Sequence, residues 1–175
     1  MVELPPSAQA GEVVPPAQLD DVDIAILRLL SANARLSQRQ IAREIGMSPP
    51  SVGDRLSRLE KSGVIRGYRV DLDFGAVGYP LVAYILIALQ GAPEPDLIEQ
   101  LRDLPEVEDV HIVTGPRDLL VRIRVRDHEH LRTVLLERIW TAPGVARVES
   151  CISLGGMKPQ VYNVKLLDAI ADRSA

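Results

Sequence analysis

The stretch from Gly46 to Ile65, GMSPPSVGDRLSRLEKSGVI, combines a helix start signal, a helix stop signal and a cationic outer face. Pro49 biases Ser48 toward an extended conformation and itself suits the first helical turn, so Ser48 is the expected N-cap. Gly63 can adopt the left-handed conformation that ends a helix. This helix would bury a single apolar stripe, formed by Val52, Leu56 and Leu59.

The side chains that point away from this stripe are of types that bind nucleic acid. An α-helix fits the major groove of B-DNA, where polar side chains meet base edges and an apolar one can contact a thymine methyl group. Contacts to phosphates orient such a helix without reading sequence. The base-edge candidates are Ser51, Arg55, Asp54 and Pro50, and the phosphate candidates are Arg35, Ser37, Gln38, Arg39, Ser48 and Arg58. The alternative is the solvated face of a three-helix bundle.

Two short helical patterns precede this helix. Asp20 is the expected N-cap of the first, and Ser37 with Gln40 forms a capping box that opens the second. The second pattern stops at Gly46, and the short turn to Ser48 gives the spacing of a helix-turn-helix. The alternating segment that follows, VIRGYRVDLD, predicts a strand pair or wing.

Charge is unevenly distributed along the chain. The 175 residues carry a net charge of −4, yet residues 28–69 hold nine Lys or Arg and only three Asp or Glu. A local basic patch is the electrostatic feature that attracts nucleic acid. The first helices are therefore expected to carry the polyanion-binding surface on an otherwise acidic protein.

The second half of the chain changes to a β-α-β-β-α-β pattern from Tyr79 onward. The strand 81–89 is apolar on both faces, which predicts burial on both sides. This order is that of a ferredoxin-like α+β fold, with both helices on one face of an antiparallel sheet and the other face covered by another copy or a ligand. The expected parts are a disordered arm (1–18), a winged helix-turn-helix domain (19–73), a hinge (74–80), a ferredoxin-like βαββαβ domain (81–158) and a C-terminal tail (159–175).

Several kinds of chemistry are disfavoured. The single Cys151 excludes an internal disulfide and is interpreted as a small buried hydrophobic residue. His128 and His130 lie two positions apart on a helix and so point in different directions, which disfavours a shared metal ion. No nucleophile with a base, carboxylate pair or metal-ligand spacing is evident, so an enzyme is not expected. The longest apolar run is too short to span a bilayer, and no secretory signal opens the chain. We expect a soluble cytoplasmic protein with no cofactor and no metal.

The segment LDDVDIAILRLLSANARLSQRQIAREIGMSPPSVGDRLSRLEKSGVIRGYRVDLD resembles the DNA-binding domain of the Lrp/AsnC family of transcription regulators. The resemblance extends over about residues 19–159. It rests on Leu19-Asp20, Asp23, Arg35-Leu36-Ser37, Gly46-Met47-Ser48 and RLSRLEKSGVIRGY.

The resemblance also implies an effector site and an assembly. In that family, second domains pair sheet to sheet into dimers, dimers form rings such as octamers, and an amino acid binds near a Gly-x-x-Asp loop. Here the loop is TGPRDLL, in which Gly115 and Asp118 match, while Pro116 and Arg117 depart from the family's frequent acidic and aromatic residues. The effector candidates are His111, Thr114, Gly115, Pro116, Arg117 and Asp118. The alternatives are a plain hairpin turn and, for His111, a packed interface residue.

The sequence thus predicts a sequence-specific, DNA-binding transcriptional regulator whose assembly and DNA binding respond to an amino acid. It would be nucleoid-associated and bind double-stranded DNA and copies of itself, with no membrane partner. The alternative is an amino-acid sensor or nucleoid-architectural protein with weak, nonspecific DNA binding. Arg122, Arg124 and Arg126 alternate along one strand, where they could pair with acidic side chains of a partner subunit. Ion pairing or a solvated face is favoured over a second nucleic-acid surface.

Overall fold

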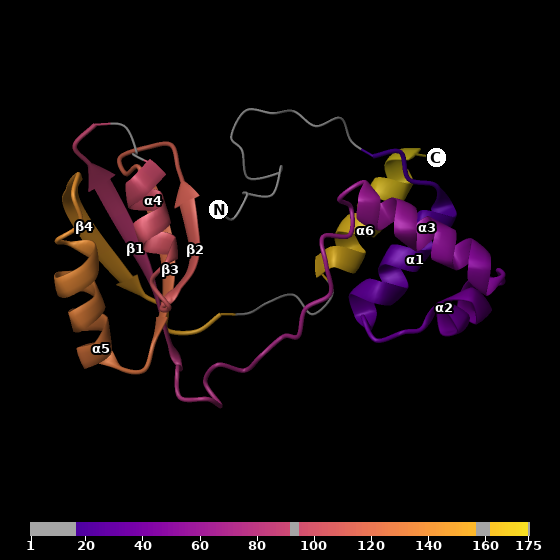
Figure 1. The fold of residues 1–175 in the computed structure, drawn as a ribbon, viewed down its shortest axis with the longest axis horizontal. Coiled ribbons are helices and arrows are strands. Elements are labelled where there is room, and N and C mark those ends of the chain that lie inside the picture. The colour runs from indigo at the N-terminus through magenta and orange to yellow at the C-terminus, as the bar shows by residue number, and fades with distance from the viewer. Residues whose placement is uncertain (1–16, 92–94, 157–161, 175) are drawn as a thin grey trace. The chain divides into compact units, whose positions relative to one another are not determined.

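The computed structural model of the chain describes residues 17–91, 95–156 and 162–174, which form two compact units (Figure 1). The N-terminal unit contains the described residues up to Val70 together with residues 162–174, and the second unit begins at Asp71. The predicted arm, apart from residues 17 and 18, lies outside the described residues.

The first part of the N-terminal unit forms three helices, α1 (Asp21–Ala32), α2 (Gln38–Ile45) and α3 (Pro49–Lys61). Each begins at the predicted cap. The Asp20 carboxylate accepts a hydrogen bond from the Asp23 amide, and Ser37 and Ser48 cap α2 and α3 in the same way. Such caps satisfy backbone amides that have no partner inside the helix. The helices enclose a core of Ile26, Ile41, Ala42, Val52, Leu56 and Leu59.

A further helix, α6 (Tyr162–Ser174), belongs to the N-terminal unit and packs against α1. The guanidinium of Arg28 lies 2.5 Å from the Asp168 carboxylate across this contact. The sequence predicted only a tail for residues 159–175. The N-terminal unit is therefore built from two stretches of chain that lie on either side of the second unit in the sequence.

The strand pair or wing predicted after α3 is not present as regular strand in the single chain. Residues 66–73 form neither helix nor strand. The alternating apolar side chains are nevertheless there, with Tyr68 49%, Val70 82% and Leu72 58% exposed. A strand needs a neighbour for its backbone hydrogen bonds, and no described strand pairs with this segment.

The second unit is the predicted ferredoxin-like fold. Its elements are β1 (Leu81–Leu89), α4 (Pro95–Arg102), β2 (Val107–Ile112), β3 (Leu119–Val125), α5 (His128–Thr133), the π-helix η2 (Val134–Ile139) and β4 (Val145–Ile152). The strands form one antiparallel sheet in the order β2-β3-β1-β4. The predicted second helix is thus a continuous helical stretch that changes to π geometry, where the Trp140 amide donates to the Leu135 carbonyl.

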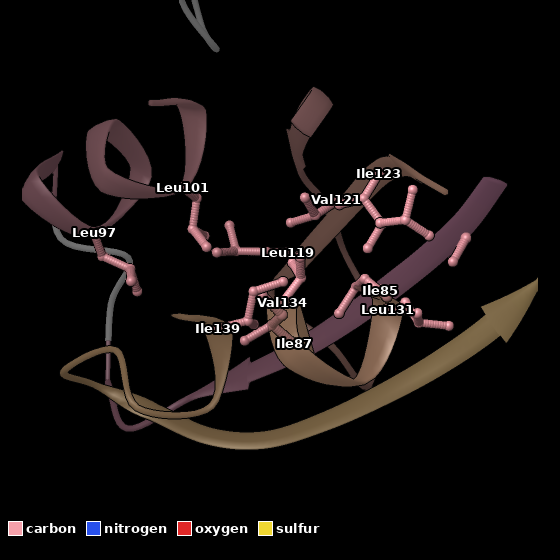
Figure 2. Close-up of a cluster of buried hydrophobic side chains, with 12 residues drawn as sticks. Ile85, Ile87, Leu97, Leu101, Leu119, Val121, Ile123, Leu131, Val134 and Ile139 are labelled. Carbon is pink, nitrogen blue, oxygen red and sulfur yellow. The ribbon is translucent and has the colours of Figure 1, made fainter. Parts of the chain in front are cut away.

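The helices α4, α5 and η2 all cover the same face of this sheet (Figure 2). Alternate residues of β1 and β3, including Ile85 and Ile123, point into a core that α4 and η2 close with Leu101 and Ile139. The other face, which we call the open face, carries Tyr84 of β1, whose side chain is 38% exposed. Among the described helices, none combines the length and apolar character needed to cross a membrane.

Candidate nucleic-acid interface and effector loop

The α2–α3 pair has the geometry of a helix-turn-helix. Gly46 ends α2 with a φ of 70°, and the Met47 amide donates to the Ala42 carbonyl at 2.9 Å. Gly53 lets the two helices approach closely, because a Cβ built on it would lie 3.1 Å from Oε1 of Gln38. The start of α2 and the first turns of α3 are thereby held together.

The predicted contact residues are gathered on this pair of helices, with most of them at the surface. Ser51 is half-buried, and its hydroxyl lies 2.8 Å from that of Ser48, which also accepts a hydrogen bond from the Ser51 amide. Arg55 is the second half-buried member. The exposed members are Arg35, Ser37, Gln38, Arg39, Ser48, Pro50, Asp54 and Arg58.

Arg55 and Arg58 are tied to the start of α1. Nη1 of Arg55 donates to Asp20 at 2.6 Å and to Asp23 at 2.8 Å, and Nη2 of Arg58 donates to Asp23 at 2.6 Å. The Asp23 side chain is completely buried, whereas that of Arg58 is 56% exposed. We call these four residues the acid–arginine cluster. It fixes α3 against α1 and neutralises much of the charge on that flank of α3.

The cluster makes N-terminal stability sensitive to acid. The Arg55 guanidinium, followed by the Asp23 amide, lowers the pKa of Asp20 below its ordinary 3.8. Since the folded pKa is the lower one, this stabilisation is complete above pH 4 and is lost as the pH falls through the folded value. We expect Asp20→Asn to remove this part of the pH dependence of the unfolding free energy. The change should be less than about 1 kcal/mol, because the Asp20 side chain is half exposed. Urea denaturation between pH 2.5 and 6 measures it, and an unchanged pH profile would contradict it.

The effector loop uses its charged groups within the chain. Oδ2 of Asp118 accepts the Leu89 amide at 2.8 Å, which ties the loop to the end of β1. The Arg117 guanidinium pairs with Glu149 of β4 and donates to the Pro116 carbonyl at 2.5 Å. The Arg117 hydrogen bond lowers the pKa of Glu149. A ligand at this loop would meet charges that already have partners.

The other effector candidates are more accessible. His111, Thr114, Gly115 and Pro116 are all exposed, and Gly115 has a φ of 120°, a conformation that favours glycine. His111 lies on the open face, where it is opposite Leu120 of β3.

The strand arginines are paired within the chain. Glu108 binds both Arg122, at 2.8 Å, and Arg124, so the ion pairs of these two arginines lie within the chain. Arg126 lies just beyond β3, and its Nε is 3.3 Å from Nδ1 of His130. The described residues contain no cluster of three or more groups suited to a metal ion.

The prediction that Cys151 is buried is wrong. Its side chain is exposed, because it lies opposite Tyr84 on the open face of the sheet rather than under the helices.

These two units define a class of protein, a DNA-binding regulator with a helix-turn-helix domain and a separate ferredoxin-like ligand-binding domain. Residues 19–66 match the family model described as winged helix-turn-helix DNA-binding, and residues 82–162 match that of the Lrp/AsnC ligand binding domain. The chain belongs to the Lrp/AsnC family of transcriptional regulators, as its sequence predicts.

Named relatives agree with this assignment. The chain is 35% identical to the HTH-type transcriptional regulator AldR of Mycobacterium tuberculosis over 148 residues, which cover 83% of each protein. The structure of Escherichia coli AsnC superposes with a TM-score of 0.77 at 28% identity, covering 82% of this chain and 98% of that one. A Neisseria meningitidis regulator in complex with L-Met has a TM-score of 0.74 at 29% identity, covering 81% and 94%.

Proposed function

We propose that α3 enters the major groove of duplex DNA with its N-terminal turns foremost, while the start of α2 holds the phosphate backbone. The observation that carries this is the exposure of Gln38, Arg39, Pro50 and Asp54 on two capped helices joined by a tight turn. Helix-turn-helix proteins place these same positions against base edges and phosphates. Pro50 and Asp54 are then the exposed base-edge candidates, with Ser51 beside its cap.

We further propose that the second unit binds an amino acid and mediates self-association. The ligand-binding family model and the L-Met complex of the Neisseria regulator support an amino-acid effector. Tyr84 on the open face and the alternating Tyr68, Val70 and Leu72 are exposed apolar side chains that a second copy would cover. Dimers, and rings of dimers such as octamers, would place several α3 helices on one DNA molecule.

In this function the protein is a regulator without enzymatic activity that acts in the cytoplasm, on the DNA of the nucleoid. A second function, nonspecific architectural binding, is favoured by one observation. The acid–arginine cluster engages Arg55, which is the base-edge cation of α3, and Arg58, which is a phosphate candidate.

Fluorescence anisotropy with the full-length protein separates the two. The probes are the DNA upstream of its own gene and a scrambled fragment of equal length, at two salt concentrations, with and without each amino acid. Preference for the native fragment that persists at higher salt supports sequence-specific regulation. Equal binding to both fragments that disappears with salt would support the architectural function instead.

Phosphate contacts predict a salt signature. Arg35→Gln and Arg39→Gln should each reduce the slope of log affinity against log salt by about one unit, with sequence preference unchanged. Asp54→Ala should instead alter the preference at one base position while leaving the slope the same. Arg102→Gln, at an exposed position on α4, is the matched control. Equal slopes for all four proteins would remove Arg35 and Arg39 from the interface.

A further inference from the structure

A cavity of about 500 Å³ lies in the second unit between residues 74–79, residues 105–108 and Arg124. We call it the linker pocket. β2 begins and β3 ends beside it, whereas the effector loop joins the opposite ends of these two strands. The linker pocket and the effector loop are therefore separate places on the same sheet.

One wall of the linker pocket is a turn that is fixed by hydrogen bonds. Oδ1 of Asp73 accepts the amides of Gly75 and Ala76, and the Tyr79 amide donates to the Phe74 carbonyl at 2.8 Å. These bonds hold three large apolar side chains at the cavity, of which Phe74 is 41%, Val77 67% and Tyr79 37% exposed. Apolar surface gathered in a concave site of this size is typical of small-molecule pockets.

The other wall carries a positive and a negative side chain, Arg124 and Glu106, and both are held by contacts within the chain. The Arg124 guanidinium lies 5.1 Å from the centre of the Phe74 ring, pairs with Glu108, and donates through Nη1 to the Tyr79 carbonyl at 3.3 Å. Glu106 lies 3.0 Å from Nε2 of His130, whose ring packs edge-on against Tyr79. Among the described residues, these contacts leave Nη2 of Arg124 and Oε2 of Glu106 available to a ligand.

We propose that the linker pocket binds a zwitterionic amino acid with a large apolar side chain. Its carboxylate would accept a hydrogen bond from Nη2 of Arg124, and its ammonium group would donate one to Glu106. Its side chain would lie among Phe74, Val77 and Tyr79. Charge-assisted hydrogen bonds of this kind are strong where solvent is partly excluded. A singly charged ligand would satisfy only one of the two groups, and a small amino acid would leave the apolar wall uncovered.

A ligand bound in the linker pocket would contact the segment that leads to the DNA-binding unit. Residues 74–79 begin four positions after Val70, the last residue of the N-terminal unit before the second unit begins. A ligand that joins this segment to β2 and β3 would restrict it. The resulting effect on DNA affinity equals the difference in ligand affinity between the DNA-bound and free forms. Both the class of ligand and this coupling rest on the proposed function, in which the second unit binds an amino acid.

Isothermal titration calorimetry of the full-length protein with L-phenylalanine, L-leucine, L-methionine, glycine and phenethylamine tests the proposal. We expect saturable binding of the large apolar amino acids, and binding at least tenfold weaker for glycine and for phenethylamine, which lacks the carboxylate. Phe74→Ala and the near-isosteric Glu106→Gln should each weaken binding at least tenfold. Leu154→Ala, at an exposed apolar position outside the cavity, should leave it within twofold. Arg117→Ala should do the same, because it changes the effector loop and not the linker pocket.

Two results would overturn the linker pocket as a ligand site. One is that none of the three large amino acids binds. The other is that Arg117→Ala abolishes binding while Phe74→Ala does not, which would move the ligand to the effector loop. DNA anisotropy on the same protein samples is read separately, so intact DNA binding without ligand binding rejects the linker pocket and leaves the DNA-binding function standing.

Discussion

Replacing Asp23 with alanine should destabilise the N-terminal unit by about 2–3 kcal/mol. Asp23 is completely buried and binds both Arg55 and Arg58. Removing one partner of a buried ion pair typically costs about 3–5 kcal/mol, because the remaining charge has no partner. We expect the lower figure because the arginines are only partly buried and can regain water.

The readout must report on one unit, so native-state hydrogen exchange of the α1 and α3 amides is the measurement. Asp21→Ala is the matched control, since Asp21 is an exposed acid in the same first turn. It should cost no more than about 0.5–1 kcal/mol, through the helix dipole. Equal losses of protection for the two variants would show that the acid–arginine cluster contributes nothing beyond that dipole.

The second large effect is expected on β1, where adjacent residues face opposite sides of the sheet. Ile85→Ala should destabilise the second unit by about 3–4 kcal/mol, because Ile85 is completely buried in the core and its removal leaves a cavity. Tyr84→Ala should change the stability of the monomer by less than about 1 kcal/mol, because Tyr84 is 38% exposed on the open face.

Tyr84→Ala should instead weaken self-association about tenfold if a second copy covers the open face, since a buried aromatic at an interface is worth more than about 1 kcal/mol. Analytical ultracentrifugation over a range of protein concentrations measures this directly. A Tyr84→Ala protein that associates as the wild type does would place the interface elsewhere. An Ile85→Ala protein as stable as the wild type would contradict the packing of the core.

Local chemistry was enough to predict most of the helices and strands of this fold. The caps at Asp20, Ser37 and Ser48 are confirmed because each depends on residues within three positions of it. The sheet followed from the alternation of strands and helices. Helix α6 was not predicted, because its place depends on a contact with α1 more than a hundred residues away. The strand predicted after α3 is not formed in the single chain for a related reason, since a β-prone sequence forms a strand only where it has a neighbour.

In the candidate site, too, local features could be predicted from the sequence, whereas contacts between distant residues could not. Which residues of α2 and α3 face outward could be predicted from helical periodicity. That Arg55 and Arg58 bind Asp20 and Asp23 could not, although two acids spaced three apart at the start of α1 and two arginines spaced three apart on α3 were a signal for it. Likewise, the partners of Arg117 and Asp118 come from β4 and the end of β1, which only the folded sheet brings to the loop.

The packing of α6 against α1 has a consequence for how the protein is made. A ribosome synthesises α1 to α3 first, then the whole second unit, and only afterwards the helix that completes the first. The surface of α1 that contacts α6 therefore has no partner until the whole second unit has been synthesised. A chain that carries the complete N-terminal unit thus always carries the second unit as well.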